Sequence, residues 1–126
     1  MPRNAINPAG MSAVGPYSHA IRSGNLVLLS GKLGTDDAGK LVGAGIVEQT
    51  KQTFANLKVV LEAAGLGFEQ VLKCNVYLTD MADFAAMNAV YAEHFREPYP
   101  ARTTVAVAAL PLAARVEIEL VAELKQ

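Results

Sequence analysis

Apolar residues recur at alternating spacings of three and four in the middle of the chain, which is the period of an α-helix. The members of this stripe are Val47, Thr50, Phe54, Leu57, Leu61 and Ala64. Most charged residues of the segment fall off the stripe, and Gly65 follows it as a residue suited to the left-handed position that often ends a helix. The pattern predicts an amphipathic helix that ends at Gly65.

A second helical stripe follows Asp80, a residue type that caps helix N-termini, with acidic Asp83 three residues later. Its inward positions are Phe84, Met87, Asn88, Tyr91 and Phe95. Asn88 brings an amide into this stripe and must find hydrogen-bond partners. It could tie the helix to a loop or contact a ligand, and the pattern does not choose between the two.

Alternation of apolar and polar residues predicts strands in the rest of the chain. From Gln70 to Thr79, one face carries Leu72, Cys74, Val76 and Leu78. The other expected strands are a hairpin of Tyr17 to Arg22 with Leu26 to Ser30, a short strand at Leu41-Val42, and closing strands at Arg102 to Ala109 and Arg115 to Leu124.

This order of elements predicts a single domain over residues 1–126, of the α+β class, with a mixed sheet and two helices packed on one side of it. The opposite sheet face is left without a helix. We expect other subunits to cover that face.

The amino-acid composition and net charge exclude several classes of function. Of 126 residues, 52% are hydrophobic and 18% charged, which indicates a folded chain, and the net charge of −1 argues against nucleic-acid or anionic-lipid partners. The single cysteine, Cys74, excludes an intrachain disulfide and is interpreted as a core residue, and two histidines add too little for a closed zinc site. His19 and His94 are interpreted as surface or hydrogen-bonded histidines. With no segment of the ~20 apolar residues that span a bilayer, we expect a cytoplasmic protein without membrane contact.

The two closing strands carry the candidate chemistry. Alternation places Glu117 and Glu119 on the face opposite Val116, and Arg102 opens its strand directly after a rigid Pro-Ala corner. Charged groups on strands are held rigidly, as ligand positioning requires. A solvated sheet face with ordinary cross-strand charge pairs would give the same pattern, so both interpretations stay open at this point.

Several short runs together resemble one known family. They are Gly15-Pro16-Tyr17-Ser18, Leu29-Ser30-Gly31, Asn88, Pro100-Ala101-Arg102 and Val116-Glu117-Ile118-Glu119. In order and spacing these runs resemble the Rid family, also called YjgF/YER057c/UK114, over essentially the whole chain.

The resemblance implies a chorismate-mutase-like subunit in a homotrimer, with ligand sites between subunits. It also implies an enamine/imine deaminase that hydrolyses 2-imino acids such as 2-iminobutanoate and 2-iminopropanoate. We expect this reaction to need no cofactor, because the imine is already activated once it is protonated, and the few histidines and cysteines predict no metal. By position, Arg102 would hold the substrate carboxylate and Glu117 would position or activate water. Tyr17, Ser30, Gly31, Asn88 and Thr104 would line or support the substrate pocket.

Two positions depart from the family pattern. Thr104 stands where members often have cysteine, and Lys32 stands where glutamine is common. Lys32 would add a positive charge near the pocket and could alter the substrate range. The alternative functions are a non-catalytic ligand-binding or regulatory module of the same fold, and RNA cleavage or translation inhibition, against which the charge balance argues.

Overall fold

The computed structural model describes residues 2–125, which form one sheet and two main helices. The strands are β1 Asn4–Ile6, β2 Ala20–Ser23, β3 Leu26–Lys32, β4 Val71–Leu78, β5 Ala101–Ala106 and β6 Val116–Glu123. The helices are α1 Ile46–Ala63 and α2 Phe84–Tyr91, with short 3-10 turns at Phe68–Gln70, Met81–Asp83 and Pro111–Ala113.

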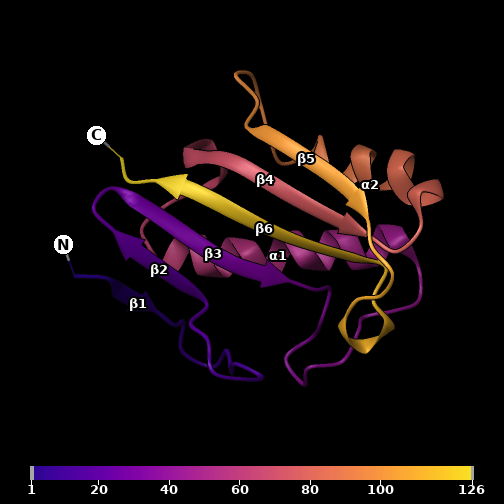
Figure 1. Ribbon diagram of the computed structural model, residues 1–126, viewed down its shortest axis with the longest axis horizontal. Helices are drawn as coiled ribbons and strands as arrows, with labels where there is room; N and C mark the ends of the chain where they lie inside the picture. Colours follow the sequence, from indigo (N-terminus) through magenta and orange to yellow (C-terminus); the bar gives the residue numbers. More distant parts are fainter. Residues whose placement is uncertain (1, 126) are drawn as a thin grey trace.

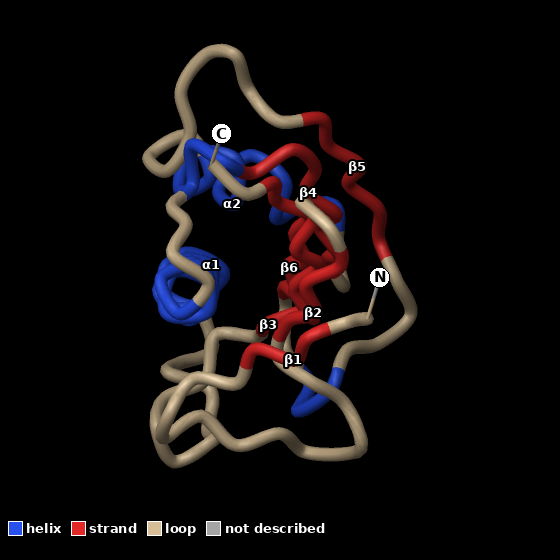
Figure 2. The backbone as a smooth tube through the Cα atoms, turned by 90° about the vertical axis from the view of Figure 1, so that its left-hand side faces the viewer, coloured by secondary structure: helices blue, strands red, loops and turns tan. Residues whose placement is uncertain are grey.

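The sheet order is β1-β2-β3-β6-β4-β5, so the last strand of the chain lies in the middle of the sheet (Figure 1). Only β4 and β5 pair in parallel, and the other neighbours are antiparallel. Both helices lie on the same side of the sheet (Figure 2). The expected mixed α+β sheet with helices on one side is confirmed.

Most predicted strands occur, with shifted ends. The hairpin forms, but its first strand begins at Ala20 because the preceding residues belong to a loop. The expected strand at Leu41-Val42 is wrong, since Leu41 makes only an isolated bridge with Thr35. The three-residue strand β1 was not predicted, because three residues carry too little alternation to be recognised.

Two expected inward residues point outward. The pairing of β4 with β6 shifts between Val71 and Lys73, so Val71 is buried and Leu72 is exposed. In α1, Ile46 packs against the core and Val47 is exposed. The prediction was correct for the rest of the α1 stripe, and Gly65 has the left-handed φ of +76° expected of a residue that ends a helix.

An aromatic cluster fills the space between α1 and α2. Phe54 is fully buried and contacts Phe68, Tyr91 and Phe95 edge to face. The half-buried His94 stacks on Phe54 with ring centroids 4.3 Å apart, so this histidine is a packing residue. Cys74 is buried as expected, and burial raises the pKa of its thiol to about 11.

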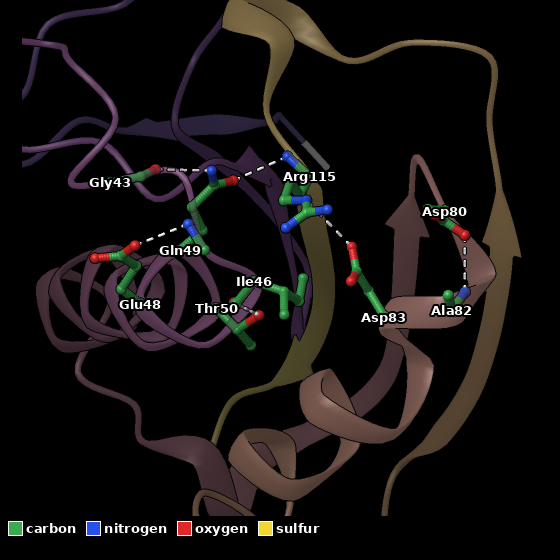
Figure 3. A network of polar contacts seen from close by, with 10 residues as sticks. Gly43, Ile46, Glu48, Gln49, Thr50, Asp80, Ala82, Asp83 and Arg115 are labelled. Atoms are coloured by element: carbon green, nitrogen blue, oxygen red, sulfur yellow. Dashed lines mark hydrogen bonds and ion pairs between the residues drawn. The ribbon is translucent and has the colours of Figure 1, made fainter.

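The start of β6 is tied to α1 by a buried glutamine (Figure 3). The Gln49 side-chain amide donates to the Gly43 carbonyl at 2.9 Å and accepts from the Arg115 backbone N–H at 2.8 Å. The Arg115 guanidinium lies 3.4 Å from Asp83 in the 3-10 turn before α2. Asp80 caps that turn through the Ala82 N–H, one turn earlier than the predicted cap of α2 itself. These contacts fix the backbone just before Glu117.

No helix within residues 2–125 is both long and apolar enough to cross a bilayer.

We expect Gln49→Ala to lower the free energy of unfolding by about 2–4 kcal/mol, because it leaves the Gly43 carbonyl and the Arg115 N–H without their partner. Urea unfolding at fixed protein concentration measures this loss. Lys51→Ala, an exposed position on the same helix, is the matched control and should change it by less than about 0.5 kcal/mol. A loss at Gln49 as small as the control's would contradict this role.

Candidate functional site

A hollow of about 720 Å³ opens beside the middle strands of the sheet. It lies between the N-terminal loop, the loop after β3 and the start of β6, and its lining includes Tyr17, Ser30, Gly31, Lys32 and Glu117. Four of the predicted site residues therefore meet in one place. A shallower hollow of about 440 Å³ at the start of α1 contains none of them.

Glu117 reaches the hollow because β6 alternates strictly. Val116 and Ile118 are fully buried on the helix side, so the half-buried Glu117 side chain lies on the helix-free face. Its carboxylate lies over the backbone of Gly31, where a Cβ would come within 2.7 Å of Glu117 Oε2. Glycine at position 31 is thus what leaves room for the carboxylate.

The environment of Glu117 favours its protonated form. Burial raises the pKa of Glu117, and the negative charge of Glu119 on the same face raises it further. A carboxyl group whose pKa moves toward neutrality can both accept and donate a proton near pH 7. Among residues 2–125, no side chain forms a hydrogen bond or ion pair with this carboxyl group, so it is available to a ligand.

Glu119 has a different environment. It accepts hydrogen bonds from the Tyr77 hydroxyl and from Asn75 Nδ2, the latter at 3.2 Å. The hydrogen bond to Glu119 is the main reason that the pKa of Tyr77 rises to about 12. Hydrogen bonds therefore hold the Glu119 carboxylate in place, whereas the Glu117 carboxylate has no such bond within residues 2–125.

Ser30, at the end of β3, is hydrogen-bonded to the N-terminal loop on the other side of the hollow. Its hydroxyl donates to the Ser18 carbonyl at 2.6 Å, and its backbone N–H donates to the His19 carbonyl at 2.9 Å. These bonds hold the loop that carries Tyr17, whose ring meets the His19 ring edge to face at 5.9 Å. Ser30 supports the site through this loop.

A bulge turns Lys32 toward the helix side. Leu29 pairs with Leu120 and Lys32 pairs with Ile118, so Ser30 and Gly31 together stand opposite one residue of β6. Lys32 consequently shares the buried face of Ile118, and its Nζ donates to His19 Nδ1. From the sequence we expected Lys32 to add a positive charge near the pocket. Its burial and its contact with His19 could not be predicted, because the bulge depends on how β3 pairs with β6.

The remaining predicted residues form a second group beside α2. Arg102 Nη1 donates to Asn88 Oδ1 at 2.5 Å, and the guanidinium lies 4.6 Å from the centre of the Tyr91 ring and 5.5 Å from that of Phe84. Asn88 thus finds its partner in Arg102. The buried Thr104 Oγ1 nearby has no hydrogen-bond partner within residues 2–125.

One chain does not bring Arg102 and Glu117 together. Arg102 pairs with Cys74, which is buried on the helix side, whereas Glu117 pairs with Tyr77 on the opposite face. Strand β4 also separates β5 from β6. The predicted site residues therefore lie in two separate groups, the hollow with Glu117 and the β5–α2 group with Arg102.

No three His, Cys, Asp or Glu side chains in the described part of the chain are placed to hold a metal ion together.

Comparison with known proteins identifies the family. The family model described as Endoribonuclease L-PSP matches residues 8–124. A goat (Capra hircus) protein named 2-iminobutanoate/2-iminopropanoate deaminase is 46% identical over 112 residues, which cover 88% of this chain and 82% of that protein. The Arabidopsis thaliana protein named Reactive Intermediate Deaminase A, chloroplastic, is 46% identical over 90% of this chain, and the match spans 61% of that longer protein.

The fold agrees with this assignment. The crystal structure of the yeast protein YEO7 superimposes with a TM-score of 0.94 at 38% identity, covering 98% of this chain and all of the yeast chain. Both the sequence and the fold therefore place this chain in the Rid family, whose sequence model is described as Endoribonuclease L-PSP.

Proposed function

We propose that this chain hydrolyses 2-imino acids to 2-keto acids and ammonia, at a site built from these two groups, one from each of two neighbouring copies in a homotrimer. One observation carries the proposal. The half-buried Glu117 lines a hollow that has no arginine among its lining residues within 2–125, whereas Arg102 lies on the edge strand β5 of the same chain. The activity printed in the name of the goat relative supports the same reaction.

The two groups fit the chemistry of a 2-imino acid. Its planar carboxylate suits the guanidinium fork of Arg102, which Asn88 and the Tyr91 ring hold in place. Water then adds to the electrophilic C=N carbon, and the C–N bond breaks to release ammonia. Glu117 takes one proton from the water as the C–O bond forms and passes it to the nitrogen, which gives a carbinolamine. It then takes the hydroxyl proton and passes it to the same nitrogen as the C–N bond breaks and the C=O bond forms, so both protons of the water leave with the ammonia. The raised pKa of Glu117 favours this exchange.

The sheet supplies reasons for assembly. β5 is an edge strand, and the helix-free face carries exposed Leu26, Leu28 and Val105. When the edge of one copy meets the hollow of the next, the contact is head-to-tail, and such contacts form a ring where the rotation between copies closes. Three copies per ring is the number that the family resemblance implies.

The two departures from the family pattern do not remove a group that this reaction needs. Thr104 offers its hydroxyl beside Arg102, and Lys32 lies on the helix side of the sheet, opposite the face of Glu117. A cytoplasmic location stays a prediction, because the Arabidopsis relative is named as chloroplastic.

The test is keto-acid release from freshly generated 2-iminopropanoate and 2-iminobutanoate, measured against spontaneous hydrolysis. Acceleration by the purified protein supports the proposal. No acceleration, with tight binding of the 2-keto acid, would favour the ligand-binding module.

The family description makes RNA cleavage the remaining alternative. Incubation with single-stranded RNA tests it, although a net charge of −1 gives little attraction to phosphates.

Glu117→Gln should lower kcat by about 10²–10⁴-fold with little effect on folding, because the amide keeps the size of the side chain but cannot exchange the proton. Glu119→Gln is the comparison on the same strand face: Glu119 is bonded to Tyr77 and Asn75 and acts on Glu117 only through its charge, so its loss should be much smaller. Imine hydrolysis at pH 7 measures both variants. Equal losses at the two positions would contradict the role of Glu117.

Arg102→Ala should lower kcat/KM by about two to four decades, because two charge-assisted hydrogen bonds to the substrate carboxylate are worth roughly 3–6 kcal/mol together. Arg102→Lys should recover only part of this, since an ammonium cannot form the planar fork. Sedimentation equilibrium checks that each variant keeps the assembly of the parent protein. Near-normal activity of a correctly assembled Arg102→Ala protein would make Arg102 structural.

A further inference from the structure

A buried lysine, Lys32, lines the hollow from the helix side of the sheet, the face opposite the one that carries Glu117. Lys32 is 8% exposed and His19 2% exposed, and both line the hollow. Lys32 Nζ donates to His19 Nδ1, and His19 Nε2 donates to the Met11 carbonyl at 3.2 Å. The imidazole is therefore a neutral acceptor, and burial together with the Lys32 charge lowers the pKa of His19.

Lys32 has no counter-ion within the described residues. No carboxylate in residues 2–125 forms an ion pair with it. Asp36 also lines the hollow, but its carboxylate accepts the N–H groups of Ala38 and Lys40 in its own turn. Burial lowers the pKa of Lys32 to about 8. A buried ammonium without an opposite charge is costly, so an anionic group of a ligand beside it would stabilise the charged form.

The hollow has room for more than the smallest imino acids. Its volume of about 720 Å³ lies in the range that holds drug-sized ligands, whereas 2-iminopropanoate has only six non-hydrogen atoms. Glu117 and Lys32 both line this space, from opposite faces of the sheet, because the bulge at Ser30 and Gly31 puts Lys32 on the face of Ile118. A longer substrate with an anionic end would meet both.

We propose that Lys32 is a specificity-determining residue that binds a second carboxylate, so that this chain accepts 2-imino dicarboxylic acids in addition to the short monocarboxylic ones. The proposal rests on the proposed imine hydrolysis, and it adds the substrate class. His19 receives one of the three ammonium N–H groups, which leaves the others for the ligand.

The experiment compares four freshly generated substrates, 2-iminosuccinate and 2-iminoglutarate against 2-iminopropanoate and 2-iminobutanoate, at pH 7. Lys32→Gln should lower kcat/KM for the dicarboxylates by about 10- to 100-fold and change that for the monocarboxylates by less than about threefold. Lys32→Met is a second variant that also removes the charge. Lys58→Gln, at an exposed position of α1, is the matched control and should leave all four values unchanged.

Hydrolysis of the monocarboxylates alone, or an equal loss on all four substrates in Lys32→Gln, would overturn this proposal and leave the deaminase assignment standing. Calorimetry with 2-oxoglutarate and 2-oxobutanoate separates the two claims if no imine is hydrolysed. Tighter binding of 2-oxoglutarate that is lost in Lys32→Gln would then support the subsite without the reaction. Equal binding of the two keto acids would overturn it.

Discussion

The alternation of apolar and charged residues along β6 decides which side chains enter the core and which face the ligand site. It has this effect because both helices cover the same face of the sheet and β6 lies in its middle. Val116, Ile118 and Leu120 enter the core, and the residues between them face the other way. A shift of one residue would bury both Glu117 and Glu119, each at a cost of several kcal/mol. The strand therefore has one acceptable register, and Gln49 fixes where it begins.

The same alternation divides the functional groups between two surfaces. Glu117 lies on the helix-free face beside Gly31, and Arg102 lies two strands away, about 10 Å, on the helix side. Neither side chain can cross the sheet to reach the other. The proposed reaction uses both groups, so the proposal requires two copies at each site and links the activity to assembly.

The local residue pattern was sufficient to predict part of the fold and of the candidate site. The stripe of α1, the left-handed Gly65 and the opposite faces of Val116 and Glu117 follow from residue spacing, because each depends on neighbours within a few positions. Irregular pairing was not visible in the same way. A register shift exposes Leu72, and a bulge buries Lys32, and both depend on the partner strand.

The spatial relation of the candidate site residues was also beyond the sequence pattern. Strand order decides it, since β6 inserts between β3 and β4 while β5 takes the edge. The sequence named Arg102 and Glu117 correctly as strand residues but could not say that they face opposite ways. Only the resemblance suggested sites between subunits, and the separation of Arg102 from Glu117 on the sheet is the physical reason for proposing them.

Mixing two inactive variants tests the shared site most directly. Arg102→Ala chains and Glu117→Gln chains are unfolded together, refolded as a mixture and assayed for imine hydrolysis beside each variant refolded alone. If neighbouring copies complete each site, random assembly at equal amounts restores both groups at about a quarter of the sites, and activity rises to about that share of the parent value. If the mixture is no more active than the separate variants although mixed assemblies have formed, each site draws both residues from one chain, and a site shared between neighbouring copies is ruled out.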